Sequence, residues 1–335
     1  GFIKRKRGRN ERMPVGLRFQ RKHRFLGYKL KYFYYCLARR DILQKKKYYG
    51  EDNIDKTIYV IKPDYQDGVE GLLSLIHKQV LYIEYAKKKG YVPFVDWKNF
   101  KTQYYDGKTN VWNYFFKQPS ELSEKEVYQS KNVYLSGWTF KNINPSGMFE
   151  ADIFFNREIE QKSYEILKNN LAFSDEVIEI LDREAEMLDI DNCIGVYVRG
   201  TDYVKLCPSG EYIQPSVKQV KEQITKYIKK YQAPIFLVTE DGNIYDELVK
   251  DFGKSIRIVS YDSFVRNYEG KDVLSKSNVL DDDKKQRGQK YLVKMILLSR
   301  CKYLISSITQ GSKFSYSLNG GKYEDEYIFD LGLYK

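Results

Sequence analysis

The sequence predicts an α/β protein whose parallel sheets are covered by helices. Short apolar runs, typical of buried strands, alternate with longer segments that carry apolar residues at helical spacing. The alternation occurs in both halves of the 335-residue chain. Strands alternating with helices form parallel sheets, because each helix returns the chain to the edge where the next strand begins. The length exceeds the usual size of one domain, so we expect two Rossmann-like domains that face a cleft.

The first half contains a β-α-β unit with a glycine-containing turn after its first strand. Its expected elements are a strand at 58–61, a loop at 63–71, a helix at 72–88, an extended segment at 91–97 and an acidic helix at 174–188. The stretch from Phe100 to Gly147 is irregular and rich in Tyr and Trp. Aromatic rings stack well on sugars, so we expect the region 100–116 to suit an acceptor glycan.

The second half is more regular. Its expected elements are strands at 193–198, 235–239, 256–260, 303–306 and 327–330, and helices from Pro215 to about Tyr231, at 244–252, at 284–300 and from Ser312 onward. Proline is allowed in the first turn of a helix, so the first of these helices can start at Pro215. We therefore divide the chain into a basic tail at 1–47, an N-terminal acceptor domain at 48–188 and a C-terminal nucleotide-sugar domain at 189–335.

The charge of the chain is concentrated at its start. Residues 1–47 hold 17 lysines and arginines against Glu11 and Asp41, a net charge of +15. Because the whole chain carries +12, the remainder carries −3. The segment interleaves aromatics with the charges, which is typical of sequences that lie on an anionic membrane surface. A solvated terminus and non-specific nucleic-acid binding are the alternatives. No nucleic-acid fold motif follows, which disfavours the latter.

The composition and the absence of certain motifs argue against several function classes. The four cysteines are scattered, which fits a reducing compartment and argues against a zinc cluster. Only two histidines occur, so His-based chemistry is nearly excluded. No Walker loop, Gly-x-Gly-x-x-Gly fingerprint or Gly-x-Ser-x-Gly elbow is present. No apolar stretch reaches the roughly 18 residues of a membrane span. We expect a cytoplasmic protein, peripheral on the inner membrane face if the basic segment binds lipid.

The most informative residue is Arg199, which directly follows the apolar run 193–198. Ligands of open α/β sheets bind beyond the carboxyl ends of the strands. A guanidinium there suits a phosphate or diphosphate, because its planar fork matches two phosphate oxygens. A surface pair with Asp202 is the structural alternative.

Two further strand ends support the same crevice. Glu240 and Asp241 follow the next strand and could accept hydrogen bonds from sugar or ribose hydroxyls, although Asp-Gly-Asn is also a common turn. The segment Thr309-Gln310-Gly311-Ser312 leads from a strand into a helix, whose first backbone amides and positive dipole end suit an anion. Gly311 lets the chain approach that anion closely. An ordinary helix cap is the alternative here.

An acidic run at 281–283 resembles a metal-binding motif. It is followed at once by two lysines and precedes a helix, where carboxylates interact favourably with the dipole. We interpret it as a solvated helix start. Arg199 and the turn at 309–312 neutralise a diphosphate without a metal, so we expect no metal and no cofactor.

At these residues the sequence resembles the fucosyltransferase superfamily, which includes bacterial nodulation and core α1,6-fucosyltransferases and protein O-fucosyltransferases. The family motif His-Val-Arg-Arg-x-Asp is similar to the segment Tyr197–Asp202, and the segment from Leu298 to Ser312 resembles the last donor-binding segment. Residues 111–119 look like a segment of capsule-type bacterial members. Three positions depart from the pattern: Tyr197 replaces a histidine, Gly200 replaces the second arginine, and Lys294 stands where an acidic residue helps to read the base.

The resemblance implies a GT-B type glycosyltransferase that inverts the anomeric centre of GDP-fucose without a metal. Its acceptor would be a glycan or a lipid-linked glycan in surface polysaccharide or glycoconjugate synthesis. Arg199 would hold the donor β-phosphate and the leaving oxygen. Donor-site residues carried over or inferred in this way are Tyr197, Arg199, Asp202, Glu240, Asp241, Thr309, Gln310, Gly311 and Ser312.

An inverting reaction also needs a group that takes the proton of the acceptor hydroxyl. The loop at 63–71 offers Asp67 and Glu70, and the sequence does not choose between them. Two alternatives remain for the whole chain. One is a transferase of the same fold with a different nucleotide sugar. The other is a catalytically inactive protein that binds nucleotides or glycans, which the replaced histidine and second arginine would fit.

Overall fold

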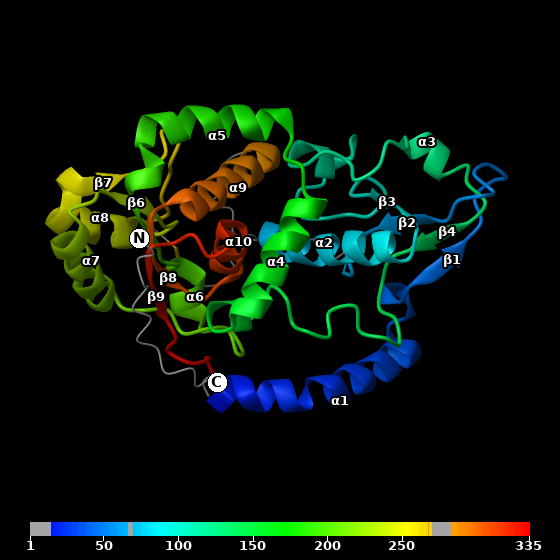
Figure 1. Ribbon diagram of the computed structural model, residues 1–335, viewed down its shortest axis with the longest axis horizontal. Helices are drawn as coiled ribbons and strands as arrows, with labels where there is room; N and C mark the ends of the chain where they lie inside the picture. Colours follow the sequence, from blue (N-terminus) through cyan, green and yellow to red (C-terminus); the bar gives the residue numbers. More distant parts are fainter. Residues whose placement is uncertain (1–14, 66–69, 267, 270–282) are drawn as a thin grey trace, which may run out of the picture.

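The computed structural model describes residues 15–65, 70–266, 268–269 and 283–335, with the backbone alone for 15–26. A mixed sheet and a parallel sheet lie at opposite ends of the molecule, and a layer of helices lies between them (Figure 1). The α/β class predicted from the alternation of strands and helices is confirmed.

The N-terminal sheet has four strands in the order β1-β4-β2-β3. They are β1 (Lys45–Lys47), β2 (Ile58–Ile61), β3 (Val92–Val95) and β4 (Val133–Leu135). β2 pairs in parallel with both β3 and β4, whereas β1 pairs antiparallel with β4. The crossover from β2 to β3 is made by α2 (Leu72–Lys88). The sheet therefore includes three residues of the segment that we separated as a basic tail.

The C-terminal sheet has five strands, all parallel, in the order β7-β6-β5-β8-β9. They are β5 (Ile194–Tyr197), β6 (Ile235–Val238), β7 (Ile256–Arg257), β8 (Tyr303–Ser307) and β9 (Asp325–Phe329). Both faces are covered. Ile194 and Val196 pack with α7 (Val217–Tyr231) and α8 (Gly242–Phe252), while Tyr197 points into the cluster that contains α9 (Lys284–Arg300).

One hydrophobic core extends across both halves. Ile61 and Val95 from the N-terminal sheet belong to the same cluster as Leu292 and Phe314 from the C-terminal half. The helices that join the sheets are α2, α4 (Arg157–Asn170), α5 (Asp175–Leu188), α9 and α10 (Gln310–Asn319). α10 contacts α2, α4 and α9, and α9 also contacts α5. The two sheets are thus held by a shared layer of helices, and the α2 and α4 helices run beside α10 in Figure 1.

The basic N-terminal segment is helical where the structure describes it. α1 (Val15–Ala38) lies along one side of the molecule and is followed by a short 3₁₀ turn at Arg40–Ile42 (Figure 1). The ring of Tyr28 stacks on Trp138 at 4.8 Å, and its hydroxyl donates to the carbonyl of Thr139 at 2.7 Å. None of the helices in the described part of the chain combines the length and the apolar character that a membrane crossing needs.

Most predicted elements occur at or within about two residues of their expected positions, and β2, α2 and α9 match fully. Two starts were wrong. α7 begins at Val217 rather than Pro215, because Ser216 is the N-cap and exchanges hydrogen bonds with Gln219 in a capping box. α10 begins at Gln310 rather than Ser312, because Thr309 is the N-cap and exchanges hydrogen bonds with Ser312 in a capping box. The structure also contains elements that we did not assign: α1, β1, β4, α4 and the short α6 (Thr201–Leu206).

Four rings of the aromatic region 100–116 do not face a ligand. Tyr104, Trp112, Phe115 and Phe116 are buried in the main core, and the rings pack on one another. The expectation that this region stacks on acceptor sugars is therefore wrong for these four side chains. Burying an aromatic ring removes a large apolar area from water, and this gain in stability explains why the rings lie in the core.

Candidate functional site

The ends of three neighbouring strands bring the predicted donor-site residues together. Tyr197 on β5 is in register with Val238 on β6 and with Ser306 on β8. Because these strands are parallel, the residues that follow them leave the sheet at the same edge. The predicted residues fall into three groups there: Arg199 and Asp202 after β5, Glu240 and Asp241 after β6, and residues 309–312 after β8.

Arg199 is held between two carboxylates and a ring. Its Nη2 donates to Asp202 Oδ1 at 2.8 Å, and its Nε lies 3.2 Å from Glu240 Oε1 without hydrogen-bond geometry. The guanidinium carbon lies 4.3 Å from the centre of the Tyr203 ring. Burial lowers the pKa of Arg199, but the charge of Glu240 and then Asp202 raises it by more, so the pKa lies above its ordinary value. Within the described chain, Nη1 makes no hydrogen bond, and this donor could meet an anion.

The turn that follows Arg199 is fixed by the two acids after β6. Glu240 Oε1 accepts from the amide of Gly200 at 2.9 Å and from the hydroxyl of Thr201 at 3.0 Å. Asp241 Oδ2 accepts from the amide of Thr201 at 2.9 Å, while its Oδ1 caps α8. Thr201 has a positive φ of 41°. The alternative that Asp241 caps a helix is therefore confirmed. The sequence did not indicate that Glu240 and Asp241 also position the turn after Arg199. Their predicted contact with sugar hydroxyls stays a prediction.

Gly200 is required by this packing. A Cβ at position 200 would lie 2.6 Å from the Cβ of Asp241. An arginine there, as in the family motif, would displace the acid that holds the turn. The departure at position 200 is therefore coupled to Asp241, and it leaves Arg199 as the guanidinium of this segment.

The first turn of α10 packs against two tyrosines. The hydroxyls of Tyr197 and Tyr291 lie 3.3 Å apart, and a Cβ at Gly311 would lie 2.7 Å from the first and 2.8 Å from the second. Thr309 Oγ1 accepts from the amide of Ser312 at 3.1 Å. The Gln310 and Gly311 amides have no partner within the helix itself, as is general for a first turn. This turn therefore lies beside β5, close to the strand end that carries Arg199.

Lys313 is a buried cation that sequence reasoning missed. It directly follows the turn at 309–312, its side chain is 7% exposed, and its Nζ lies 4.0 Å from Glu150 Oε2. Burial lowers the pKa of Lys313, and the acids Glu150 and Glu211 oppose that effect. A lysine in the first turn of a helix is unfavourable beside the positive dipole end. That unusual position is a sequence signal for an anion site.

Of the two candidate bases, only Glu70 lies in the described chain, since Asp67 lies outside it. Glu70 Oε1 accepts from the hydroxyl of Ser74 at 2.5 Å and pairs with Lys78 at 2.6 Å. Its Oε2 is buried and has no hydrogen-bond partner among the described residues. The N-terminal and C-terminal halves meet nearby, where His77 Nδ1 lies 3.2 Å from Gln310 Oε1.

Two other predicted features can be placed. Asp283 accepts from the amide of Lys285 at 2.7 Å and caps α9, in agreement with a helix start, while residues 281–282 lie outside the described chain. Lys294 on α9 is mostly buried and pairs with Asp262 at 2.8 Å. An acid therefore lies next to the lysine that replaces the acidic residue of the family.

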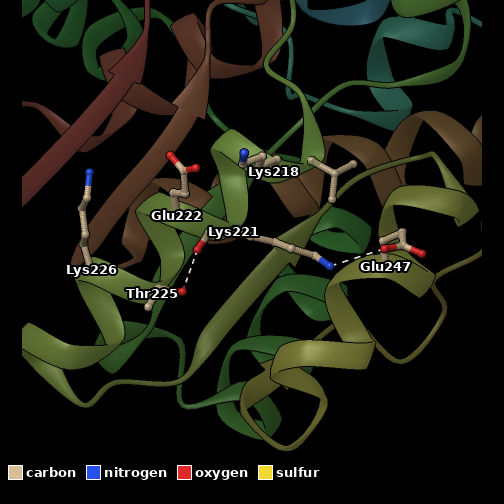
Figure 2. A pocket seen from close by; sticks show the side chains of 7 residues that line it. Lys218, Lys221, Glu222, Thr225, Lys226 and Glu247 are labelled. Atoms are coloured by element: carbon tan, nitrogen blue, oxygen red, sulfur yellow. Dashed lines mark hydrogen bonds and ion pairs between the residues drawn. The ribbon is translucent and has the colours of Figure 1, made fainter.

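A large groove lies elsewhere and carries none of this chemistry. It has a volume of about 700 Å³ and runs along the outer side of α7, between its lysines and Glu247 on α8 (Figure 2). Lys221 is paired there with Glu247 and Asp251, and the hydroxyl of Thr225 donates to the carbonyl of Lys221. The groove is a solvated helix surface, and the predicted site residues are not part of it.

Among the comparisons with known proteins, only the search of solved structures finds proteins similar to this chain. The fucosyltransferase NodZ from Bradyrhizobium is 17% identical, with a TM-score of 0.46 over 79% of this chain and 93% of its own. The protein POFUT1 in complex with GDP-fucose is 9% identical, with a TM-score of 0.46 over 84% and 100%. FUT1 of Arabidopsis thaliana in complex with GDP is 13% identical, with a TM-score of 0.42 over 93% and 78%. No family model and no curated protein matches the chain.

Proposed function

We propose that this chain is an inverting glycosyltransferase with two Rossmann-like domains in a GT-B arrangement, and that its donor diphosphate binds at Arg199. The observation that carries the proposal is the position of this guanidinium. It lies at the carboxyl edge of a parallel sheet, is oriented by Asp202 and Glu240, and has Nη1 without a protein partner among the described residues. A charged group fixed in this way stabilises the negative charge that develops on the leaving diphosphate as the bond to the sugar breaks.

The first turn of α10 and Lys313 complete the donor site in this proposal. Backbone amides at a helix start and the positive end of its dipole favour a phosphate. The buried ammonium of Lys313 lies in the same turn, with its nearest carboxylate at 4.0 Å. Two cations and a helix terminus neutralise a diphosphate, and so the reaction proceeds without a metal or other cofactor.

Glu70 is the described candidate for the general base. In an inverting reaction, the acceptor hydroxyl attacks the anomeric carbon on the face opposite to the leaving diphosphate, and a carboxylate takes its proton. Glu70 is held by Lys78 and Ser74, and its Oε2 is not engaged by the described residues. Asp67 remains the alternative base in the same loop.

The donor that fits the family resemblance is GDP-fucose, and the acceptor is a glycan or a lipid-linked glycan at the inner membrane face. The segments that resemble the family are those that bind the diphosphate. The chain departs from the family pattern at two residues linked to recognition of the nucleotide base, because Tyr197 and Lys294 replace family residues. A different nucleotide sugar is therefore the second candidate, and an inactive nucleotide-binding protein is the third.

The outer face of α1 supports a location at a membrane. Leu30, Phe33, Tyr34 and Leu37 are spaced so that they share one face of the helix, and each is more than half exposed. The exposed ring of Phe140 packs against that of Phe33 at 6.2 Å. We call these five side chains the α1 surface. Seven basic residues lie at 29–47 against one acid, so an anionic bilayer complements both the apolar and the charged character of the segment.

Calorimetric titration of GDP, UDP and dTDP tests the proposal. The variant Arg199→Lys keeps the charge between the two acids but loses the planar fork, and we expect its GDP affinity to fall about tenfold or more. Arg183→Lys, an exposed arginine beside Glu184, is the matched control and should bind as the wild type does.

Each outcome of the titration has a meaning. Binding of UDP or dTDP but not GDP would select the second candidate. GDP binding without sugar transfer from GDP-fucose to a panel of oligosaccharides would select the inactive binder. If none of the three nucleotides binds the wild-type protein, the proposal is wrong.

A further inference from the structure

A small cavity separates α1 from the junction of the two halves. It has a volume of about 200 Å³ and is lined by α1, α2, the loop at 137–150 and the first residue of α10. Pockets for drug-sized ligands measure about 300–1,000 Å³, so this one suits a single ring rather than a nucleotide. Neither Arg199 nor Glu70 lines it, but Gln310 and Lys78 do, so the cavity adjoins the proposed diphosphate site and base without including Arg199 or Glu70.

The floor of the cavity contains a carboxylate at the end of β2. Asp64 is 7% exposed, and its Oδ1 accepts from the hydroxyl of Tyr82 at 2.8 Å. Burial raises the pKa of Asp64, while the nearby charges of Lys78 and Lys62 lower it. Because these two ammonium groups offset the carboxylate, the cavity is not a strong site for a bare cation. It suits a neutral group that donates hydrogen bonds.

His77 provides a second polar group in the lining. Its side chain is buried, and Nδ1 lies 3.2 Å from Gln310 Oε1, an acceptor, which places the ring hydrogen on Nδ1. Burial lowers the pKa of His77 to about 3, so the ring is neutral and Nε2 carries a lone pair. Nε2 has no hydrogen-bond partner in the described part of the chain. A buried acceptor without a partner is costly, and a ligand hydroxyl would satisfy it.

The remaining lining contains rings and an amide beside the charged side chains of Lys78 and Glu150. Tyr28, Trp138 and Phe149 contribute aromatic surface, and Asn142 contributes an amide group, whereas the amide of Asn144 is already hydrogen-bonded to the backbone of Met148. Rings that cover the C–H faces of a pyranose, together with donors and acceptors for its hydroxyls, are the combination that a carbohydrate needs. A purely apolar ligand would leave Asp64 and His77 buried without new partners.

We propose that this cavity binds one sugar ring of the acceptor glycan, with Asp64 and His77 accepting hydrogen bonds from its hydroxyls. The inference rests on the proposed transferase function and specifies where its acceptor lies. The position is consistent with that role, because Gln310 lines the cavity while the next residue, Gly311, lies against Tyr197 two residues before Arg199. A sugar ring in the cavity is therefore separated from the donor edge by the first turn of α10.

Saturation-transfer NMR with the full chain tests the proposal, using methyl glycosides of glucose, galactose, N-acetylglucosamine and fucose as probes. We expect at least one glycoside to receive saturation from the wild-type protein. Ile143→Trp fills the cavity without removing any hydrogen bond of the described structure, and Asp64→Asn keeps its volume but removes the charge. Both should reduce the transferred signal severalfold. Glu222→Trp, in the groove of Figure 2, adds the same ring at a distance and should not.

GDP titration of the same proteins separates this inference from the proposed function. Wild-type protein that binds GDP but none of the glycosides would overturn the sugar site and leave the transferase proposal standing. Equal signals from the wild type and from a folded Ile143→Trp variant would also overturn it. Loss of signal in both variants with retained GDP affinity would support it, because that result places the sugar apart from the diphosphate.

Discussion

Gly311 lies so close to Tyr197 that a Cβ at position 311 would approach the tyrosine hydroxyl to 2.7 Å. The sequence indicated that this glycine gives an anion access to the helix start. The contact shows a further reason, which is that α10 and the end of β5 fit together only without a side chain at this position. The two strand ends that frame the proposed donor site are therefore coupled through one contact.

Replacing this glycine should disturb both strand ends. Glycine in a helix costs about 1 kcal/mol relative to alanine, so Gly311→Ala would stabilise the chain if space allowed. Tyr197 and Tyr291 leave no space, and overpacking of this kind costs about 1–3 kcal/mol. We expect net destabilisation in urea unfolding and weaker GDP binding. Gly27→Ala, at a helical position with nothing within 4 Å, should not destabilise the protein. Equal stability of Gly311→Ala and wild type would contradict the packing argument.

Lys313 should contribute more to binding than to stability. Its ammonium is buried with its nearest carboxylate 4.0 Å away, so desolvation is only partly compensated. We expect Lys313→Met to unfold at the same or a higher urea concentration while its GDP affinity falls about tenfold or more. Lys322→Met, beyond the other end of the same helix, is the control for loss of a positive charge. Unchanged GDP affinity in Lys313→Met would remove this residue from the proposed site.

The sequence predicts a structural feature well when the residues that form it lie close together along the chain. The helix at 72–88 has correct bounds because its period is local and a glycine marks each end. The convergence of Arg199, Glu240 and Thr309 follows from strand order, which alternating elements imply. The cavity around Asp64 could not be predicted, because α1 and the loop at 137–150 reach it from distant parts of the chain. The burial of Trp112 could not be predicted either, because an aromatic run has the same sequence pattern whether it faces a ligand or the core.

His77 should make the stability depend on pH. Its pKa lies at about 3 in the folded protein against 6.5 when unperturbed, because burial and then the charge of Lys313 disfavour the imidazolium. The stabilisation is fully present above about pH 6.5 and is lost as the pH falls toward 3, since only the unfolded chain takes up the proton. The expected slope is at most about 1.4 kcal/mol per pH unit. Urea unfolding of His77→Phe should show a shallower decline than wild type over this window. His23 is present in both proteins, so parallel curves would contradict the prediction.

The α1 surface should hold the protein on anionic vesicles through apolar and charged contacts together. Phe33 and Leu37 are 56% and 84% exposed, and burying such side chains contributes about 1.5–3 kcal/mol each. We therefore expect the double variant Phe33→Ser, Leu37→Ser to sediment with phosphatidylglycerol vesicles at least about tenfold less than wild type. The matched variant Ile54→Ser, Met187→Ser removes side chains of 68% and 65% exposure elsewhere and should sediment as wild type does. High salt should weaken wild-type binding, because the basic residues at 29–47 act through screened charges. If the first double variant still sediments like wild type, the membrane location is wrong, and RNA binding by the basic segment becomes the alternative to test.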